Sequence, residues 1–220
     1  MNAANTQVCL ANRPRGWVRE SDFNIVRTEI PKPGEGQVLL KNLYLSLDPY
    51  MRLRMDDAKS YAPPLDIGAV MVGGTVSEVV ESRNPDFRPG EIVFGMMGWQ
   101  LYGLSDGKML RRVDPAFAPI STALGALGMP GVTAWVGLLD LGTPKPGETV
   151  VVSAASGAVG SVVGQIAKLK GCRAVGIAGG ATKCAYVTRE LGFDACIDYR
   201  RGDLHGQLAA PCPQGVDVYF

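Results

Sequence analysis

A run of β-branched residues that passes through glycines into a helix is the feature that most restricts the fold of this chain. Residues 149–164 read TVVVSAASGAVGSVVG, with Ala155 in the first place of the usual G-x-G-x-x-G pattern. Such a strand can be buried on both faces, and glycines let backbone N–H groups approach a phosphate at the start of the helix. A glycine turn without a ligand is the alternative. The residues expected to hold the pyrophosphate of a dinucleotide are Gly157, Ala158, Val159 and Gly160.

From residue 149 onward, strand-like and helix-like segments alternate. The segments run over 149–153, 158–170, 173–178, 181–191, 195–198, 203–209 and 216–220. This alternation predicts a parallel, doubly wound sheet, the Rossmann fold. Since such a sheet is built from two similar halves, these segments supply the first half and one strand of the second. We therefore expect an α/β fold with an incomplete sheet, and a cut through the domain at Phe220.

Residues before 120 have a different pattern, rich in strands and punctuated by glycine and proline. The strand-like segments are 37–47, 69–80, 92–97 and 99–104. They predict a compact β-barrel or sandwich. After Pro119, helical spacing appears over 121–127 and 133–141, where Ser121 and Thr133 can act as caps. We therefore divide the chain into a β-rich domain over 1–120 and a nucleotide-binding domain over 121–220.

A Pro-Gly-Glu turn precedes three of the strand-like segments. The three prolines are Pro33, Pro89 and Pro146. In a type II turn, proline presets the first corner and glycine takes a positive φ at the second. We therefore expect a positive φ at the glycine that follows each of these prolines.

Composition restricts the partners of the protein. The 22 Lys and Arg against 21 Asp and Glu give a net charge of +1, so no basic field is available for nucleic acid or an anionic membrane. The sequence has no uninterrupted apolar stretch of about 18 residues. Its N-terminus also lacks the basic segment followed by an apolar run that is typical of a secretion signal. The five cysteines are odd in number and at least 12 residues apart, which fits neither a disulfide framework nor a metal ribbon. We expect a cytoplasmic protein.

Three segments of the chain resemble the medium-chain dehydrogenase/reductase superfamily. They are LSLDPYMR at 45–52, LGMPGVTA at 127–134 and SAASGAVGSVVGQIAK at 153–168. Within it, the chain is most similar to the zinc-free alkenal, prostaglandin and curcumin reductases. The resemblance implies a GroES-like N-terminal domain, a Rossmann domain, and NADPH-dependent reduction of a C=C bond in a small hydrophobic enone or enal. It also implies that a family member continues past Phe220. A homodimer is a candidate assembly of the full-length protein, whose oligomeric state the sequence leaves open.

The end of the second strand of the predicted parallel sheet favours NADPH over NADH. An NAD enzyme places Asp or Glu there to bind the ribose hydroxyls, whereas this chain has Ala178, Gly179 and Gly180. Lys183 at the start of the next helix opposes the helix dipole, which is better explained if an anion lies close. The resemblance assigns Lys183 and Tyr199 to the 2′-phosphate region of NADPH. A solvated lysine and a half-exposed tyrosine are the alternative.

The zinc ligands of related dehydrogenases are missing from the sequence. Where a Gly-His-Glu is expected, the chain reads Gly68-Ala69-Val70, so we expect no metal. Reduction of a conjugated double bond instead needs a hydrogen-bond donor for the enolate oxygen, and a tyrosine hydroxyl suits that role. We predict that Tyr61 donates this hydrogen bond or the proton and that Tyr50 shapes the substrate pocket. The alternative is that both rings only pack against neighbours.

Four further residues are candidates for the same active site. By resemblance, Met129 and Thr133 lie beside the nicotinamide, and Trp99 and Tyr102 are candidates to line the substrate cleft. The alternatives are a gap-filling methionine, a helix-capping threonine and structural aromatics. Two other functions stay open at this point. One is a non-catalytic NADPH-binding protein or an inactive truncated form, and the other is a zinc-free quinone reductase.

Overall fold

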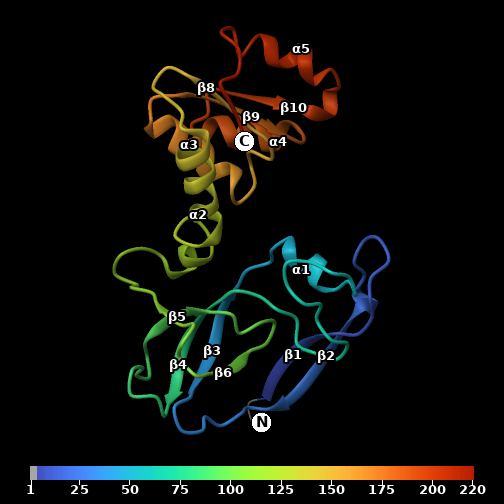
Figure 1. The fold of residues 1–220 in the computed structure, drawn as a ribbon, viewed down its shortest axis with the longest axis vertical. Helices are drawn as coiled ribbons and strands as arrows, with labels where there is room; N and C mark the ends of the chain where they lie inside the picture. The colour runs from blue at the N-terminus through green and yellow to red at the C-terminus, as the bar shows by residue number, and fades with distance from the viewer. Residues whose placement is uncertain (1–3) are drawn as a thin grey trace. The chain divides into compact units, whose positions relative to one another are not determined.

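The chain forms two compact units in the computed structural model, which describes residues 4–220 (Figure 1). The first unit ends at Leu124, and the second runs Gly125–Phe220. The boundary predicted between residues 120 and 121 falls at the start of a short 3-10 helix, η2 (Ile120–Leu124). Within residues 4–220, no helix is both long enough and apolar enough to span a bilayer.

Antiparallel strands dominate the first unit. A five-stranded sheet has the order β6-β3-β4-β5-β7, and β1 pairs with β2 in a separate ribbon. The elements are β1 (Ala4–Leu10), η1 (Glu20–Asp22), β2 (Phe23–Glu29), β3 (Val38–Leu45), α1 (Tyr50–Arg54), β4 (Thr75–Ser82), β5 (Ile92–Gly95), β6 (Tyr102–Ser105) and β7 (Arg111–Arg112). The predicted β-rich fold is confirmed. The strand expected from residue 69, however, begins only at Thr75.

Two of the three predicted Pro-Gly turns have the expected geometry. Gly90 and Gly147 have φ values of 90° and 89°, and the strands β5 and β8 follow them. The prediction for Gly34 is wrong, because the turn lies further along the chain. The Gln37 N–H donates to the Gly34 carbonyl at 3.1 Å, so Gly36 takes the positive φ of 74°.

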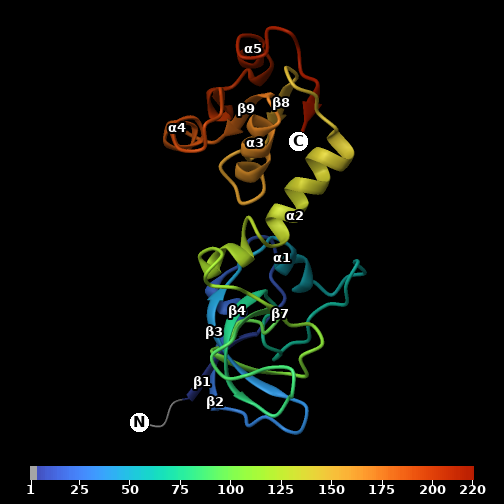
Figure 2. The same cartoon turned by 90° about the vertical axis from the view of Figure 1, so that its left-hand side faces the viewer.

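The second unit is built on a parallel sheet of four strands in the order β10-β9-β8-β11. Figure 2 labels its two central strands, β8 and β9. Its elements are β8 (Thr149–Val152), α3 (Gly160–Leu169), β9 (Arg173–Ala178), α4 (Ala181–Arg189), β10 (Ala195–Asp198), η4 (Tyr199–Arg201), α5 (Leu204–Ala209) and β11 (Val218–Tyr219). This confirms the predicted Rossmann sheet. The strand order reverses at β8, between β9 and β11, and ligands of open α/β sheets bind at the carboxyl ends of the strands beside such a reversal.

One long helical stretch precedes the parallel sheet. It consists of α2 (Met129–Trp135) followed by a π-helical stretch, η3 (Val136–Gly142). Its buried residues Ala134 and Leu138 pack with the valines of β8 and with α3 in the main core of the second unit. The helix predicted over 133–141 is therefore confirmed, whereas 121–127 contains the 3-10 helix η2 in place of an α-helix.

Candidate cofactor site

The backbone folds tightly where β8 ends. All four residues of β8 are buried. Ala154 then takes a left-handed φ of 45°. The Ala155 N–H donates to the Ile177 carbonyl of β9 at 3.0 Å, and the Gly157 N–H donates to the Ala154 carbonyl at 2.7 Å. The first bond anchors the turn to the neighbouring strand, and the second closes the turn itself just before α3 begins at Gly160.

Close backbone approach requires glycine at two positions of this turn. A Cβ atom at Gly160 would lie 2.6 Å from the Ala154 carbonyl oxygen, and one at Gly157 would lie 3.0 Å from it. The first N–H groups of an α-helix have no acceptor within the helix, and the helix dipole attracts anions to them. The backbone from Gly157 to Gly160, including Ala158 and Val159, can therefore bind a pyrophosphate.

Tyr199 covers the glycine that follows β9. A Cβ atom at Gly179 would lie 2.7 Å from the Tyr199 hydroxyl oxygen and 2.9 Å from its Cζ. The tyrosine is nevertheless 54% exposed, so its ring rests on the glycine backbone and also faces solvent. Gly180, with φ of 97°, is the N-cap of α4. The fold thus brings Tyr199 to the double glycine, although the two lie about 20 residues apart in the sequence.

Lys183 lies in the first turn of α4. The side chain is exposed, and this turn contains no acidic residue. A cation at a helix N-terminus is unfavourable on its own, because it meets the positive end of the helix dipole. The position of Lys183, three residues after Gly180, is therefore consistent with an anion bound at this end of the sheet.

Asp198 ties the loop after β9 to the loop after β10, which the sequence analysis missed. Its Oδ1 accepts hydrogen bonds from the Gly180 N–H at 2.8 Å and the Arg200 N–H at 3.1 Å. The Gly180 N–H is the main reason that the pKa of Asp198 is lowered. The same carboxylate lies 3.9 Å from the Arg201 Nε. The spacing of Asp198 and Arg200 is that of an Asx-turn, a signal that the sequence offered.

Arg200 is a second residue that the sequence analysis missed. Its Nη1 lies 3.5 Å from the position that a Cβ atom would occupy at Gly180. The side chain is exposed, and its backbone is fixed by Asp198. Arg200 therefore places a guanidinium group beside the same double glycine as Tyr199, and guanidinium groups bind phosphates well.

Met129 and Thr133 lie one helical turn apart on α2. Met129 is the first residue of the helix and is 53% exposed. The Thr133 hydroxyl donates to the Met129 carbonyl at 2.8 Å. The N-cap of α2 is Gly128, so the alternative that Thr133 caps a helix is wrong. Their expected position beside a nicotinamide stays a prediction.

Two of the predicted active-site tyrosines, Tyr50 and Tyr61, lie in the first unit. Tyr50 is the first residue of α1, and Tyr61 is 74% exposed. Burial raises the pKa of Tyr50, and the charges of Asp48 and Tyr61 raise it further. The Tyr50 hydroxyl therefore stays protonated at neutral pH and can donate a hydrogen bond.

Trp99 and Tyr102 have different surroundings. Trp99 stacks on Phe23 with ring centroids 5.6 Å apart, and among the described residues its buried Nε1 has no hydrogen-bond partner. It also lines a cavity of about 300 Å³ with residues of β1 and β3. The Tyr102 backbone is held by Asn5, whose side chain bonds both its N–H and its carbonyl at 2.9 Å. Tyr102 does not line that cavity.

Two family models match the chain. One, the N-terminal domain of oxidoreductase, matches residues 6–113, and the other, zinc-binding dehydrogenase, matches residues 158–220. In the part of the chain that the structure describes, no three His, Cys, Asp or Glu side chains gather in a group that could hold a metal ion.

Several known reductases are similar along nearly the whole chain. The NADPH-dependent curcumin reductase of Escherichia coli is 55% identical over 98% of this chain and 63% of its own length. Prostaglandin reductase 1 of Rattus norvegicus is 47% identical over 93% of this chain and 61% of its own. The crystal structure of CurA in complex with NADPH from Vibrio vulnificus has a TM-score of 0.92 and 52% identity, over 98% of this chain and 64% of CurA.

The chain spans less than two thirds of the length of these relatives. The similarity nevertheless covers both compact units, the β-rich one and the one with the parallel sheet. The predicted GroES-like and Rossmann folds are thereby confirmed. The chain belongs to the medium-chain dehydrogenase/reductase superfamily, in the branch that includes the curcumin and prostaglandin reductases.

Proposed function

We propose that the protein carrying this chain is an NADPH-dependent reductase that transfers hydride to the C=C bond of an α,β-unsaturated ketone or aldehyde. The similarity to the curcumin and prostaglandin reductases supports this reaction class. The observation that carries the proposal is the cluster at the end of β9. There Gly179 and Gly180 stand in place of the acidic residue of an NAD site, and Tyr199 covers the first of them.

The residues of this cluster fit the 2′-phosphate of NADPH. Neither residue 179 nor residue 180 carries a carboxylate to repel it, and Lys183 and Arg200 supply positive charge near the double glycine. Asp198 is the acidic group beside this cluster, and its Oδ1 is occupied by two backbone N–H groups. The chain therefore offers a site with positive side chains next to the exposed backbone of two glycines, and such a site suits a phosphate better than a ribose hydroxyl.

The other cofactor contacts are proposed from the positions of the elements. NADPH, when bound, supplies the hydride. The turn from Gly157 to Gly160, which leads into α3, is proposed to bind the pyrophosphate through the backbone N–H groups after that of Gly157, since the Gly157 N–H donates to the Ala154 carbonyl. Met129 and Thr133 of α2 are proposed to lie beside the nicotinamide ring.

Tyrosine hydroxyls are proposed to stabilise the charge that develops on the substrate. Addition of hydride to the β-carbon leaves negative charge on the carbonyl oxygen, and a nearby O–H group lowers the barrier by donating a hydrogen bond to it. Tyr61 is proposed to donate this bond, and the α-carbon then takes up a proton. The raised pKa of Tyr50, caused first by burial, keeps its hydroxyl in the donor form beside Tyr61. Trp99 and Tyr102 are proposed to contact the apolar part of the substrate.

The setting of the enzyme is part of the same proposal. The net charge of +1 and the five unpaired cysteines support a cytoplasmic enzyme that binds neither nucleic acid nor membranes. A homodimer is proposed for the full-length protein, by similarity to the superfamily.

The test is NADPH consumption by the protein expressed from its complete reading frame. We expect the absorbance of NADPH to fall with a short enone or 2-alkenal and to stay constant with the matching saturated ketone. NADH should support a much lower rate, because the site favours the 2′-phosphate. A quinone used in parallel distinguishes the two reductase classes. A folded protein that consumes no NADPH with any enone, or that prefers the quinone, would contradict the proposal.

A further inference from the structure

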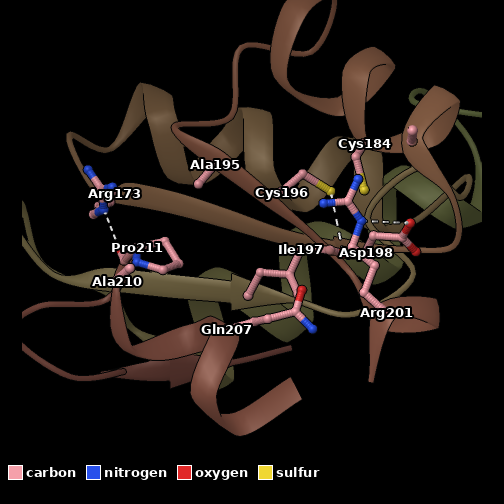
Figure 3. Close-up of a pocket in the computed structure, with 11 residues that line it drawn as sticks. Arg173, Cys184, Ala195, Cys196, Ile197, Asp198, Arg201, Gln207, Ala210 and Pro211 are labelled. Atoms are coloured by element: carbon pink, nitrogen blue, oxygen red, sulfur yellow. Dashed lines mark hydrogen bonds and ion pairs between the residues drawn. The ribbon is translucent and has the colours of Figure 1, made fainter. Parts of the chain in front are cut away.

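A pocket of about 580 Å³ lies along β10 in the second unit, and Figure 3 shows the residues that line it. Helix α4 contributes Cys184, and β10 contributes Cys196. Both cysteines are partly buried and free of disulfides, whereas Cys9, Cys172 and Cys212 are buried. The pocket therefore gives solvent and small solutes access to two thiols from different elements.

The sheet register shows where the Cys196 thiol lies. Cys196 pairs with Gly176 of β9. A Cβ atom at Gly176 would lie 3.3 Å from the Cys196 Sγ and 2.9 Å from Cγ1 of Val187 in α4. The space above this glycine is thus filled by the Cys196 sulfur together with a side chain of α4, so the thiol lies on the side of the sheet that α4 covers.

Helical spacing brings the second thiol to the same place. Cys184 precedes Val187 by three residues, and residues three apart share one face of a helix. Val187 is buried against the sheet beside Cys196, so Cys184 also faces β10. The Cys184 thiol contributes to raising the pKa of Cys196, and Figure 3 shows both sulfur atoms turned toward one end of the pocket.

We propose that Cys184 and Cys196 form a modification site, a dithiol that a peroxide oxidises to a disulfide between α4 and β10. In the first step, the Cys184 sulfur attacks one peroxide oxygen, the O–O bond breaks, and a sulfenic acid and one molecule of alcohol or water form. In the second step, the Cys196 sulfur attacks the sulfenic sulfur and releases water. The two thiols lose two electrons and two protons, and the peroxide takes them up.

The surroundings of the two sulfurs indicate which one reacts with the peroxide first. Burial, followed by the neighbouring Cys184 thiol, raises the pKa of Cys196 to about 12, so this thiol stays protonated at neutral pH. Because a protonated thiol reacts slowly with a peroxide, we assign the first attack to Cys184, and Cys196 loses its proton as it attacks the sulfenic sulfur and displaces hydroxide, which takes up that proton as water. The disulfide would tie the turn of α4 that carries Lys183 to the end of β10 that carries Asp198.

Peptide mapping tests the proposal without any cofactor, so its result does not depend on the proposed reductase function. The protein from the complete reading frame is treated with hydrogen peroxide, alkylated and digested with trypsin without reduction. Cleavage after Lys183, Arg189 and Arg200 separates the cysteines onto peptides 184–189 and 190–200. We expect these two peptides to appear joined, with the loss of two alkylatable thiols and full recovery after reduction. Peroxide treatment that leaves both thiols open to alkylation would overturn the proposal.

Variants identify the role of each sulfur. Cys196→Ser should stop the reaction at a sulfenic acid on Cys184, which dimedone traps, and Cys184→Ser should leave Cys196 unoxidised. Cys212→Ser is the matched control, because Cys212 is buried in another cluster and should leave the joined peptides unchanged. A sulfenic acid on Cys196 in place of Cys184, or joined peptides that contain Cys212, would contradict the assignment.

Discussion

The carboxylate of Asp198 accepts a hydrogen bond from the backbone N–H of Gly180 at 2.8 Å, which fixes the loop after β9 against the loop after β10. Because Arg200 bonds the same oxygen, one side chain holds two parts of the proposed phosphate site in place. Asp198→Ala should therefore weaken NADPH binding about five- to tenfold, the value of about one hydrogen bond. Asp198→Asn keeps an acceptor oxygen and should bind NADPH as tightly as the wild type. Calorimetric titration measures both, and an unchanged Kd for Asp198→Ala would show that the loops hold without this bond.

Lys183→Ala should raise the Kd for NADPH about ten- to a hundredfold and leave that for NADH nearly unchanged. One charge-assisted hydrogen bond to a phosphate is worth about 1.5 to 3 kcal/mol, and NADH has no phosphate at that position. Lys170→Ala is the matched control, because it removes an exposed lysine at the C-terminal end of α3, the end of that helix opposite the proposed pyrophosphate site. An equal loss for both cofactors would show that Lys183 does not contact the 2′-phosphate.

Gly179→Ala should displace the Tyr199 ring, because the added Cβ atom would lie 2.7 Å from its hydroxyl oxygen. We expect weaker binding of 2′,5′-ADP by about tenfold and a loss of stability of about 1 to 3 kcal/mol. A double-mutant cycle with Tyr199→Ala separates the clash from other effects. If the clash is the cause, Gly179→Ala should change 2′,5′-ADP binding and stability little in the Tyr199→Ala background. Equal losses of binding and stability in both backgrounds would exclude a role for the contact between Gly179 and Tyr199.

Lys168 and Asp194 should make the stability of the second unit depend on pH. Burial alone would raise the pKa of Asp194, but the Lys168 ammonium at 2.7 Å and the Ala174 N–H at 2.7 Å outweigh it and lower that pKa below 3.8. The folded state therefore gains stability above the usual carboxyl pKa and loses it as pH falls through the lowered value. Compared with Asp194→Asn in urea unfolding, the wild type should be about 0.5 to 1 kcal/mol more stable at neutral pH. This advantage should vanish in acid, and a constant difference would refute the linkage.

Tyr61→Phe should lower kcat for enone reduction about a hundredfold while leaving the Kd for NADPH unchanged. Removal of the hydroxyl takes away the hydrogen bond that is proposed to stabilise the enolate oxygen. Tyr50→Phe is the comparison, because its hydroxyl is proposed to shape the pocket and its loss should act mainly on KM. Steady-state kinetics of the full-length protein measures both. If kcat fell more for Tyr50→Phe than for Tyr61→Phe, Tyr50 and not Tyr61 would be the hydrogen-bond donor to the enolate.

Local sequence patterns were sufficient to predict the elements of the second unit. The valine run of β8, the glycines at 157 and 160, and the helix that follows are fixed by neighbours in the sequence, so propensity and spacing identify them. The turn at Gly34 and the cap at Thr133 were wrong because residue type alone does not locate the hydrogen bond that closes a turn or begins a helix. The turn is closed by the Gln37 N–H on the Gly34 carbonyl, and α2 begins after the N-cap Gly128.

The contacts within the proposed 2′-phosphate site, between Asp198, Gly180 and Arg200, could not be predicted from local patterns. Asp198 meets Gly180 because β10 and β9 are parallel neighbours in the register Asp198↔Ala178. Only the strand order brings the ends of the two strands together, and Arg200 joins the cluster for the same reason. A motif search therefore finds Lys183, which lies in the helix after the glycines, and misses the carboxylate that positions the loops.

The left-handed backbone of Ala154 determines at which stage the turn that leads to Gly157 and Gly160, the proposed pyrophosphate site, takes its shape. A non-glycine residue with φ of 45° costs about 1 to 3 kcal/mol, and it persists only where surrounding structure enforces it. At Ala154 the enforcement comes from hydrogen bonds inside the folded unit, including the one between Ala155 and β9. The conformational penalty is thus met during folding, and the proposed pyrophosphate site would offer its donors already aligned.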